Sequence, residues 1–142
     1  LILGSFPSVK SREMKFFYGH PQNRFWKVLA GLTRSECPQT IEEKREFLIH
    51  NHIAVWDVIK SCDIIGSSDS SIKNVSVNDI KNIIENSDIK AVFTNGGTAH
   101  KLYKKYMDCD YEAVKLPSTS PANAAYSLDK LINEWKVILD YL

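Results

Sequence analysis

The sequence predicts a three-layer α/β/α fold around a central, mostly parallel sheet of four strands. Two observations support this fold class: short apolar segments alternate with segments of helical periodicity, and each intervening segment is long enough to cross over a sheet. A length of 142 residues suits one domain with a buried core. We therefore expect a single domain over residues 1–142, in which right-handed crossovers bring the carboxyl ends of the strands to one edge.

The first half of the chain contains two expected strands and two expected helices. An apolar opening segment runs into a turn at Gly4, and residues 53–58 form a second apolar run. Apolar side chains spaced for one helical face predict a helix over residues 24–32. A capping-box pattern that begins at Thr40 predicts another helix over residues 41–51.

The second half continues this alternation after a segment of different composition. Residues 62–75 are rich in Ser, Asp and Gly, which predicts a loop. The elements expected beyond it are a helix over 78–85, a strand over 89–95, a helix over 98–106, a strand over 111–116 and a final helix over 127–141.

The overall charge is nearly balanced, and its distribution says more than its sum. Lys and Arg total 18 against 17 Asp and Glu, a net charge of +1, which by itself predicts no nucleic-acid partner. Basic residues are concentrated in and just after the first loop, at Lys10, Arg12, Lys15, Arg24 and Lys27. A local stripe of this kind suffices for a few phosphate contacts, and solvated side chains on helix surfaces are the equally weighted alternative.

Cysteine usage and hydropathy indicate the compartment. Cys37, Cys62 and Cys109 are far apart and lack zinc-ligand spacing, which favours reduced thiols in a cytoplasmic protein. No apolar run reaches the roughly 18 residues of a membrane span, and no signal-peptide pattern precedes the first strand. We expect no association with a membrane. Because the chain starts within a strand and without Met, we also expect natural N-terminal residues to be missing.

Polar or turn-forming residues follow each expected strand: Gly4-Ser5, Asp57, Asn95-Gly96 and Pro117-Ser118. Parallel strands bring them to one edge, where open α/β sheets bind ligands. The chain lacks GxSxG, Walker and GxGxxG motifs, which disfavours a serine hydrolase, a P-loop enzyme and a dinucleotide reductase. A glycoside hydrolase with paired carboxylates is disfavoured because Asp57 is the one obvious acid at this edge. A neutral polar pocket suits hydrolysis of a base–sugar bond, because main-chain N–H groups can stabilise an anionic leaving base.

Three blocks of residues carry a resemblance to a known family: 4–7, 17–26 and 116–122. They resemble the uracil-DNA glycosylase superfamily, and they are most similar to its hypoxanthine-DNA (deoxyinosine) glycosylase branch. The specific block is His20-Pro21-Gln22-Asn23-Arg24-Phe25-Trp26, and the resemblance covers essentially the whole chain. It implies a uracil-DNA glycosylase-like fold and a monofunctional enzyme of base excision repair that acts as a monomer without a metal or cofactor. Such an enzyme flips a damaged base out of double-stranded DNA, hydrolyses its bond to deoxyribose and leaves an abasic site.

The resemblance also implies roles for particular positions. Asn23 is implied to be catalytic and to orient the attacking water. Relatives usually carry Asn or Asp where this chain has Ser5, and those that remove uracil fast have His or Asn where it has Leu116. These differences favour hypoxanthine as the substrate. A uracil or mismatch-specific glycosylase and a non-catalytic DNA-binding relative are the alternatives. The implied location is the cytoplasm, with nucleoid association in a prokaryote.

The remaining candidate residues form two groups. Those expected to bind the flipped base are Gly4, Ser5, Phe6, Pro7, Tyr18, His20, Asp57 and Asn95, with Tyr18 stacking on the base. Those expected to bind DNA are Lys10, Arg12, Pro117, Ser118, Thr119, Ser120, Pro121 and Ala122. Structural alternatives stay open for most of them: Asn23 could cap a helix, Tyr18 could be core, and His20 is favoured as a structural hydrogen-bonder.

The loop over residues 117–123 is expected to enter the duplex, although it has no large apolar tip. Base flipping loses a few kcal/mol of stacking, which an inserted side chain usually offsets. Weak insertion would favour lesions that are already poorly paired, such as deoxyinosine.

Overall fold

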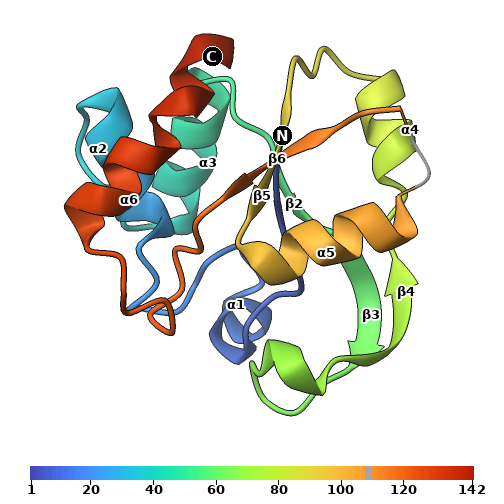
Figure 1. Cartoon of the computed structure of the whole chain (residues 1–142). Helices are drawn as coiled ribbons and strands as arrows, with labels where there is room; N and C mark the ends of the chain where they lie inside the picture. The colour runs from blue at the N-terminus through green and yellow to red at the C-terminus, as the bar shows by residue number, and fades with distance from the viewer. Residues whose placement is uncertain (108–109) are drawn as a thin grey trace.

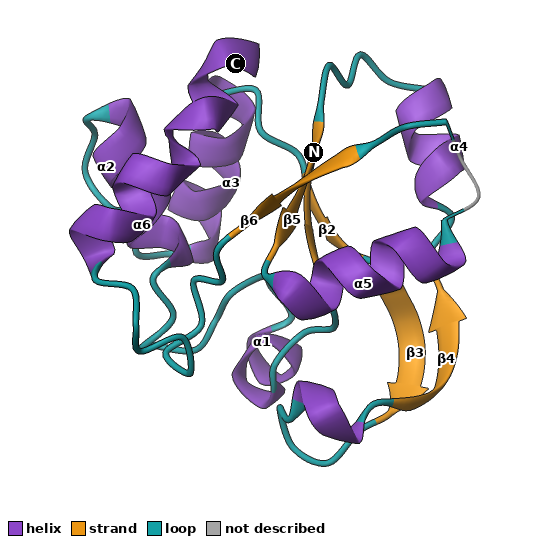
Figure 2. Cartoon of the chain, in the orientation of Figure 1, coloured by secondary structure: helices purple, strands orange, loops and turns teal. Residues whose placement is uncertain are grey.

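The computed structural model describes residues 1–107 and 110–142, and a sheet of four parallel strands lies at its centre (Figures 1 and 2). The strands are β1 (Ile2–Gly4), β2 (Val55–Asp57), β5 (Val92–Asn95) and β6 (Ala113–Leu116), in the order β2-β1-β5-β6. Each neighbouring pair in this sheet is parallel. The predicted fold class is confirmed.

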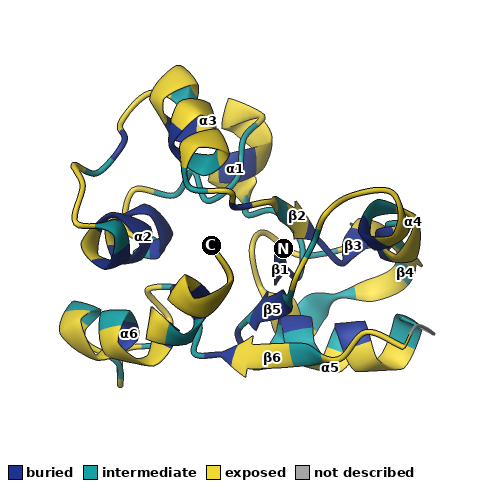
Figure 3. Ribbon diagram, turned by 90° about the horizontal axis from the view of Figure 1, so that it is seen from above, coloured by how far each residue is buried: buried dark blue, intermediate teal, exposed yellow. Residues whose placement is uncertain are grey.

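Helices cover both faces of the sheet (Figure 1). One layer contains α2 (Phe25–Thr33), α3 (Ile41–His50) and α6 (Leu128–Trp135), and the other contains α4 (Ile80–Glu85) and α5 (Gly97–Tyr106). Each layer has its own apolar cluster, and neighbouring strand residues enter opposite clusters: Ile2 packs with Phe25 and Trp135, whereas Leu3 packs with Ile80 and Tyr103. This alternation is the period of two that a strand requires when both faces of its sheet are covered. Viewed from above, β1 and β5 are buried between the layers, and the exposed residues of α3 and α6 face outward (Figure 3).

Two segments predicted as loops contain regular structure. A short helix, α1 (Val9–Met14), follows β1, and the Ser8 hydroxyl accepts a hydrogen bond from the Ser11 N–H at its start. An antiparallel hairpin of β3 (Ile59–Asp63) and β4 (Lys73–Val77) occupies both ends of the segment predicted as a loop over 62–75, and residues 64–72 form the connection between the two strands. The loop prediction was wrong at those two ends because the strands are polar and largely exposed. Main-chain pairing defines them, and they lack the apolar alternation from which a strand is predicted.

The remaining elements are 3₁₀ turns: η1 (Asp69–Ser71) in the hairpin connection and η2 (Lys136–Tyr141) after α6, where the sequence predicted a continuous helix. Cys37 and Cys62 are free thiols, and Cys109 lies outside the described residues. Within the described part of the chain, no helix is both long enough and apolar enough to cross a bilayer. The same residues contain no group of three or more His, Cys, Asp and Glu placed to hold a metal ion.

Gly96 brings two strand ends together at the carboxyl edge of the sheet. Its N–H donates to the Leu116 carbonyl oxygen at 2.9 Å, and its φ of +97° lies in a region that L residues rarely adopt. A Cβ atom at this position would lie 3.0 Å from Cβ of Ser118. The end of β5 can therefore lie against the start of the loop after β6 only because residue 96 has no side chain.

We predict that Gly96→Ala lowers the free energy of unfolding by about 1–3 kcal/mol, because it adds both backbone strain and a clash. The matched control is Gly97→Ala, since a Cβ there would have no neighbouring atom within 4 Å and the residue begins α5. That change should leave stability equal or slightly increased, by up to about 1 kcal/mol. Urea denaturation monitored by tryptophan fluorescence measures both variants, and equal stabilities would contradict the prediction.

Candidate functional site

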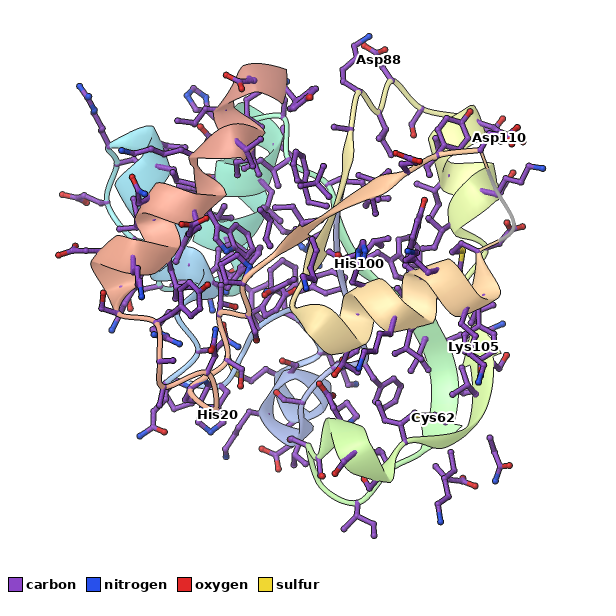
Figure 4. All side chains as sticks on the ribbon, viewed as in Figure 1. His20, Cys62, Asp88, His100, Lys105 and Asp110 are labelled. Atoms are coloured by element: carbon purple, nitrogen blue, oxygen red, sulfur yellow. The ribbon has the colours of Figure 1, made fainter. Side chains whose placement is uncertain are left out.

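A cavity of about 340 Å³ lies at the carboxyl edge of the sheet. Its wall includes most of the predicted site residues, namely Gly4, Ser5, Phe6, Pro7, Tyr18, His20, Asn23, Asp57, Asn95, Ser118, Thr119, Ser120, Pro121 and Ala122. His20 marks this end of the molecule in Figure 4, and Asp88 marks the opposite end. A larger cavity, of about 650 Å³, is lined by Ala54, Ala91 and other residues near the amino ends of the strands. None of the predicted site residues lines it.

Three polar side chains from separate segments form a directed set of hydrogen bonds in the cavity wall. Asn23 Oδ1 accepts from the Phe25 N–H and from the Thr119 hydroxyl, each at 2.9 Å. The same hydroxyl accepts from Asn95 Nδ2 at 2.9 Å, while the Thr119 N–H donates to Asn95 Oδ1 at 3.0 Å. Because a main-chain N–H can only donate, these contacts fix the orientation of both amides.

The fixed orientation divides the Asn23 amide between two roles. Its oxygen is used within the protein, where it accepts the Phe25 N–H at the start of α2. Its nitrogen has no hydrogen-bond partner among the described residues, and Asn23 lines the cavity. Asn23 therefore satisfies the first N–H of α2 with its oxygen, although Arg24 occupies the N-cap position, and its nitrogen remains a free donor for a molecule in the cavity.

Tyr18 lies between the core and the cavity. Its ring stacks on the buried Phe25 ring, with the centroids 3.9 Å apart and an angle of 18° between the planes. A Cβ atom on Gly4 would lie 3.0 Å from the Tyr18 hydroxyl, so this hydroxyl also reaches the end of β1. Burial, followed by the charge of Asp57, raises the pKa of the hydroxyl, which therefore stays protonated at neutral pH. Stacking of Tyr18 on a base stays a prediction, and Phe25 already covers one face of the ring.

Asp57 places a carboxyl group at the end of β2, inside the cavity wall. The residue is 9% exposed, and burial raises the pKa of its carboxyl to about 7. Its main-chain carbonyl accepts from Asn78 Nδ2 at 2.8 Å, but the carboxylate itself has no hydrogen bond or ion pair within the described residues. Asp57 therefore changes between its neutral and ionised forms near neutral pH.

Arg24 has a role that the sequence did not reveal. Instead of contributing to an open basic stripe, its guanidinium donates to the main-chain carbonyls of Ser120 at 2.9 Å, Asn123 at 3.0 Å and Tyr126. The main-chain N–H of Arg24 donates to the Thr119 carbonyl at 3.0 Å. The Arg24 side chain thus fixes the loop after β6 through three of its main-chain carbonyls. No local sequence pattern predicts this contact, because the acceptors are distant main-chain carbonyls and every residue type has one.

The same loop is fixed at its start as well. Trp135 Nε1 donates to the Pro117 carbonyl, and Asn123 Nδ2 donates to the Ser118 carbonyl, each at 3.0 Å. Pro121 and Ala122 remain exposed at its tip. The predicted DNA-binding loop therefore forms an ordered rim of the cavity, with small side chains outward.

The other predicted basic and polar residues have partners within the chain. Lys10 pairs with Glu13 at 3.1 Å on the exposed face of α1. The Arg12 guanidinium donates to the Gly66 carbonyl at 2.8 Å, which ties α1 to the hairpin connection. His20 Nδ1 accepts from the N–H two residues on, at 3.1 Å, as a structural hydrogen-bonder would. Neither basic side chain belongs to an unpaired stripe, and their contact with DNA stays a prediction.

Comparisons with known proteins agree over nearly the full chain. The family model described as "Uracil DNA glycosylase superfamily" matches residues 1–142. A "Hypoxanthine DNA glycosylase" of Methanosarcina acetivorans is 36% identical over 140 residues, which cover 97% of this chain and 88% of that protein. A protein of the same description from Methanosarcina barkeri is 33% identical over 127 residues, which cover 87% and 79% of the two chains. The solution NMR structure of a candidate uracil DNA glycosylase from Methanosarcina acetivorans superposes with a TM-score of 0.81 at 32% identity, covering 96% of this chain and 86% of that one.

We predict that Thr119→Val lowers the free energy of unfolding by about 1–3 kcal/mol, because it leaves the Asn95 Nδ2 group without its buried acceptor. Thr119→Ser is the matched control: it keeps the hydroxyl, removes one methyl and should lose only about 1 kcal/mol. Chemical denaturation measures both variants. If Ser destabilised the protein as much as Val, packing of the methyl group would matter more than the hydrogen bonds.

We predict that Asp57→Asn stabilises the protein, and more so at higher pH. Burial holds the pKa of the Asp57 carboxyl at about 7 in the folded chain against an ordinary value of 3.8, so the wild-type protein loses stability as the pH rises between these values. The gain from the substitution should be larger at about pH 8 than at about pH 5 by roughly 2–3 kcal/mol. Urea titrations at the two pH values test this, and a gain independent of pH would show that the carboxyl is not buried in its charged form.

Proposed function

Because the chain belongs to the uracil DNA glycosylase superfamily, we propose that it is a monofunctional DNA glycosylase that removes hypoxanthine from deoxyinosine. It acts as a single-domain monomer on double-stranded DNA, without a metal or cofactor, and leaves an abasic site for base excision repair in the cytoplasm. Its relatives described as hypoxanthine DNA glycosylases match most of this chain, which supports the substrate.

One observation carries the proposal: the free amide nitrogen of Asn23 in the wall of a cavity at the carboxyl edge of the sheet. In the reaction, the base leaves with the electron pair of the N-glycosidic bond and the sugar becomes oxocarbenium-like. A water oxygen then bonds to the sugar carbon and releases a proton. Such an electrophilic carbon needs a well-placed water more than a strongly basic one.

Asn23 suits this task as a donor. Its Nδ2–H holds the water through one oxygen lone pair and leaves the other lone pair free to attack. Its oxygen already accepts from two donors within the protein, so the amide cannot rotate away from this position. The N–H of Phe6, which has no acceptor among the described residues, is available to the departing base at the cavity wall.

The ionised form of Asp57 suits the other product of bond cleavage. A carboxylate in the cavity wall stabilises positive charge on the sugar and can take the proton that the water releases. Since burial raises the pKa of this carboxyl to about 7, base removal should be faster above neutral pH than below it.

Two positions support hypoxanthine over uracil. Leu116 is 3% exposed and packs in the apolar cluster beneath the rim, so the position before Pro117 gives the cavity no polar side chain. The Ser5 hydroxyl donates to Asp69 Oδ1 at 3.1 Å, so it is held by the hairpin connection. The chain thus lacks the Asn or Asp that relatives usually carry at the position of Ser5, and the His or Asn that fast uracil glycosylases carry at the position of Leu116.

Labelled duplexes with a single deoxyinosine, deoxyuridine or deoxyxanthosine test the proposal. After incubation with the protein, alkaline treatment breaks the strand wherever an abasic site has formed. We expect breakage at deoxyinosine to be faster than at deoxyuridine. Faster breakage at deoxyuridine would identify a uracil or mismatch glycosylase, and binding without any breakage would identify a non-catalytic relative.

We predict that Asn23→Ala lowers the single-turnover rate on deoxyinosine by at least about 100-fold with little loss of duplex affinity, because it removes a donor aimed at the reacting water. Asn23→Asp should be slow too but better folded, since its carboxylate still accepts the Phe25 N–H and the Thr119 hydroxyl. Asn51→Ala is the control for losing a structural amide, because Asn51 Nδ2 bonds the Phe47 carbonyl at 2.8 Å, away from the cavity. An Asn23→Ala protein as fast as the parent would remove Asn23 from the mechanism.

A further inference from the structure

The connection between β3 and β4 forms a second part of the cavity rim, in addition to the loop after β6. Ile64, Ser67 and Asp69 of this connection line the cavity mouth. In Figure 1 it lies beside α1, at the end of the molecule where the parallel strands terminate. Any duplex that delivers a nucleotide to the cavity must therefore lie across both rims.

Ile65 projects from this second rim into solvent. It is 80% exposed, more than any other large apolar residue in the described part of the chain. It sits between Ile64, which lines the cavity, and Gly66, whose φ of +60° turns the chain. A single exposed isoleucine would need no explanation elsewhere on the surface, but this one stands beside the cavity mouth.

Polar contacts hold Ile65 in place although its side chain packs on nothing. Its N–H donates to the Ser71 hydroxyl at 2.8 Å, and the next carbonyl, that of Gly66, accepts from the Arg12 guanidinium at 2.8 Å. The Val9 N–H donates to the Ser67 hydroxyl at 3.1 Å. The backbone of the tip is thus tied to α1 and to itself, so the side chain is presented outward on an ordered support.

The surroundings of the tip are compatible with a phosphate backbone. Lys60 and Lys73 are exposed on the two strands, and neither has an ion pair among the described residues. The nearby acids are engaged: Asp63 accepts from Asn74 Nδ2 at 2.5 Å, and Asp69 accepts from the Ser5 hydroxyl. Lys73 at the start of β4 and Arg12 beside Gly66 therefore place positive charge near the apolar tip, whereas Lys60 lies at the other end of β3.

We propose that Ile65 enters the base stack of damaged DNA and fills the gap left by the flipped nucleotide. The proposal rests on the proposed function and assigns the insertion to the hairpin connection instead of the loop after β6, whose tip offers only Pro121 and Ala122. Isoleucine is one of the apolar side chains that proteins insert between base steps, and the loss of stacking on flipping is the penalty that such insertion offsets. The loop after β6 then holds the strand while the hairpin keeps the nucleotide out.

The test compares Ile65→Ser with the parent protein on two substrates, a duplex and the corresponding single strand, each with one deoxyinosine. On the duplex we expect the single-turnover rate to fall by at least about tenfold, because the flipped state is no longer stabilised. On the single strand, where no stack must be opened, the rate should stay within about twofold. Ile65→Leu should restore most of the duplex rate.

The matched control is Ile49→Ser, because Ile49 is 76% exposed on α3, which leads to the amino end of β2 and hence away from the cavity. It should leave both rates unchanged. If Ile65→Ser cleaved the duplex at the parental rate, or slowed both substrates equally, the wedge would be refuted.

A second measurement is independent of catalysis. With 2-aminopurine next to the lesion, binding of the parent should raise fluorescence as the stack opens, and binding of Ile65→Ser should not. An equal rise with both proteins refutes the wedge. A parent that opens the stack but releases no base from either substrate refutes the proposed function and leaves the wedge supported.

Discussion

The arrangement of the site depends on the burial of Thr119. This residue has no exposed surface, yet its hydroxyl and main-chain groups must all find partners, because an unsatisfied polar group in the interior is strongly destabilising. It finds them on Asn95 at the end of β5, on Asn23 before α2 and on the main chain of Arg24. The need to satisfy one buried threonine thereby brings three distant segments together and fixes two amide side chains at the cavity.

Different hydrogen bonds hold the two rims of the cavity: those of the loop after β6 are part-buried, and those of the hairpin connection are exposed. The loop after β6 is held by the half-buried guanidinium of Arg24 and by the indole N–H of Trp135, both of which bond its main-chain carbonyls, so its order is independent of the side chains at its tip. The hairpin connection is held by exposed hydroxyls and by Arg12, so its contacts compete with water and its local stability is lower. Under the proposed insertion, the loop after β6 positions the strand and the hairpin connection presents Ile65 to the base stack.

The sequence predicted those parts of the molecule whose cause is local. The strands of the parallel sheet were predicted from their apolar runs. The start of α3 was predicted from a capping-box pattern, and the structure contains this capping box. The convergence of Asp57, Asn95 and the strand ends at Gly4 and Leu116 followed from parallel topology, whereas the place of Asn23 was implied by the resemblance. The hairpin of β3 and β4 was missed because its pairing lies in main-chain bonds between polar residues. The role of Arg24 was missed because its acceptors are carbonyls contributed by the far end of the chain. The Asn23 oxygen is used within the protein and its nitrogen is left free partly because of the bond from Thr119. Nothing in the local sequence relates those two positions.

Asp57 shows how a group that weakens the fold can serve the proposed reaction. Its carboxylate is buried without a compensating partner in the described chain, so the ionised form is unfavourable while the cavity is empty. When the base departs, the sugar acquires positive charge within the same cavity, and a carboxylate that lacked a partner then gains one. The interaction is therefore stronger in the transition state than in the resting enzyme, which is the condition for it to accelerate bond cleavage instead of merely binding substrate. A carboxylate already paired with a lysine or arginine would have stabilised the fold and would have had less to offer the cation.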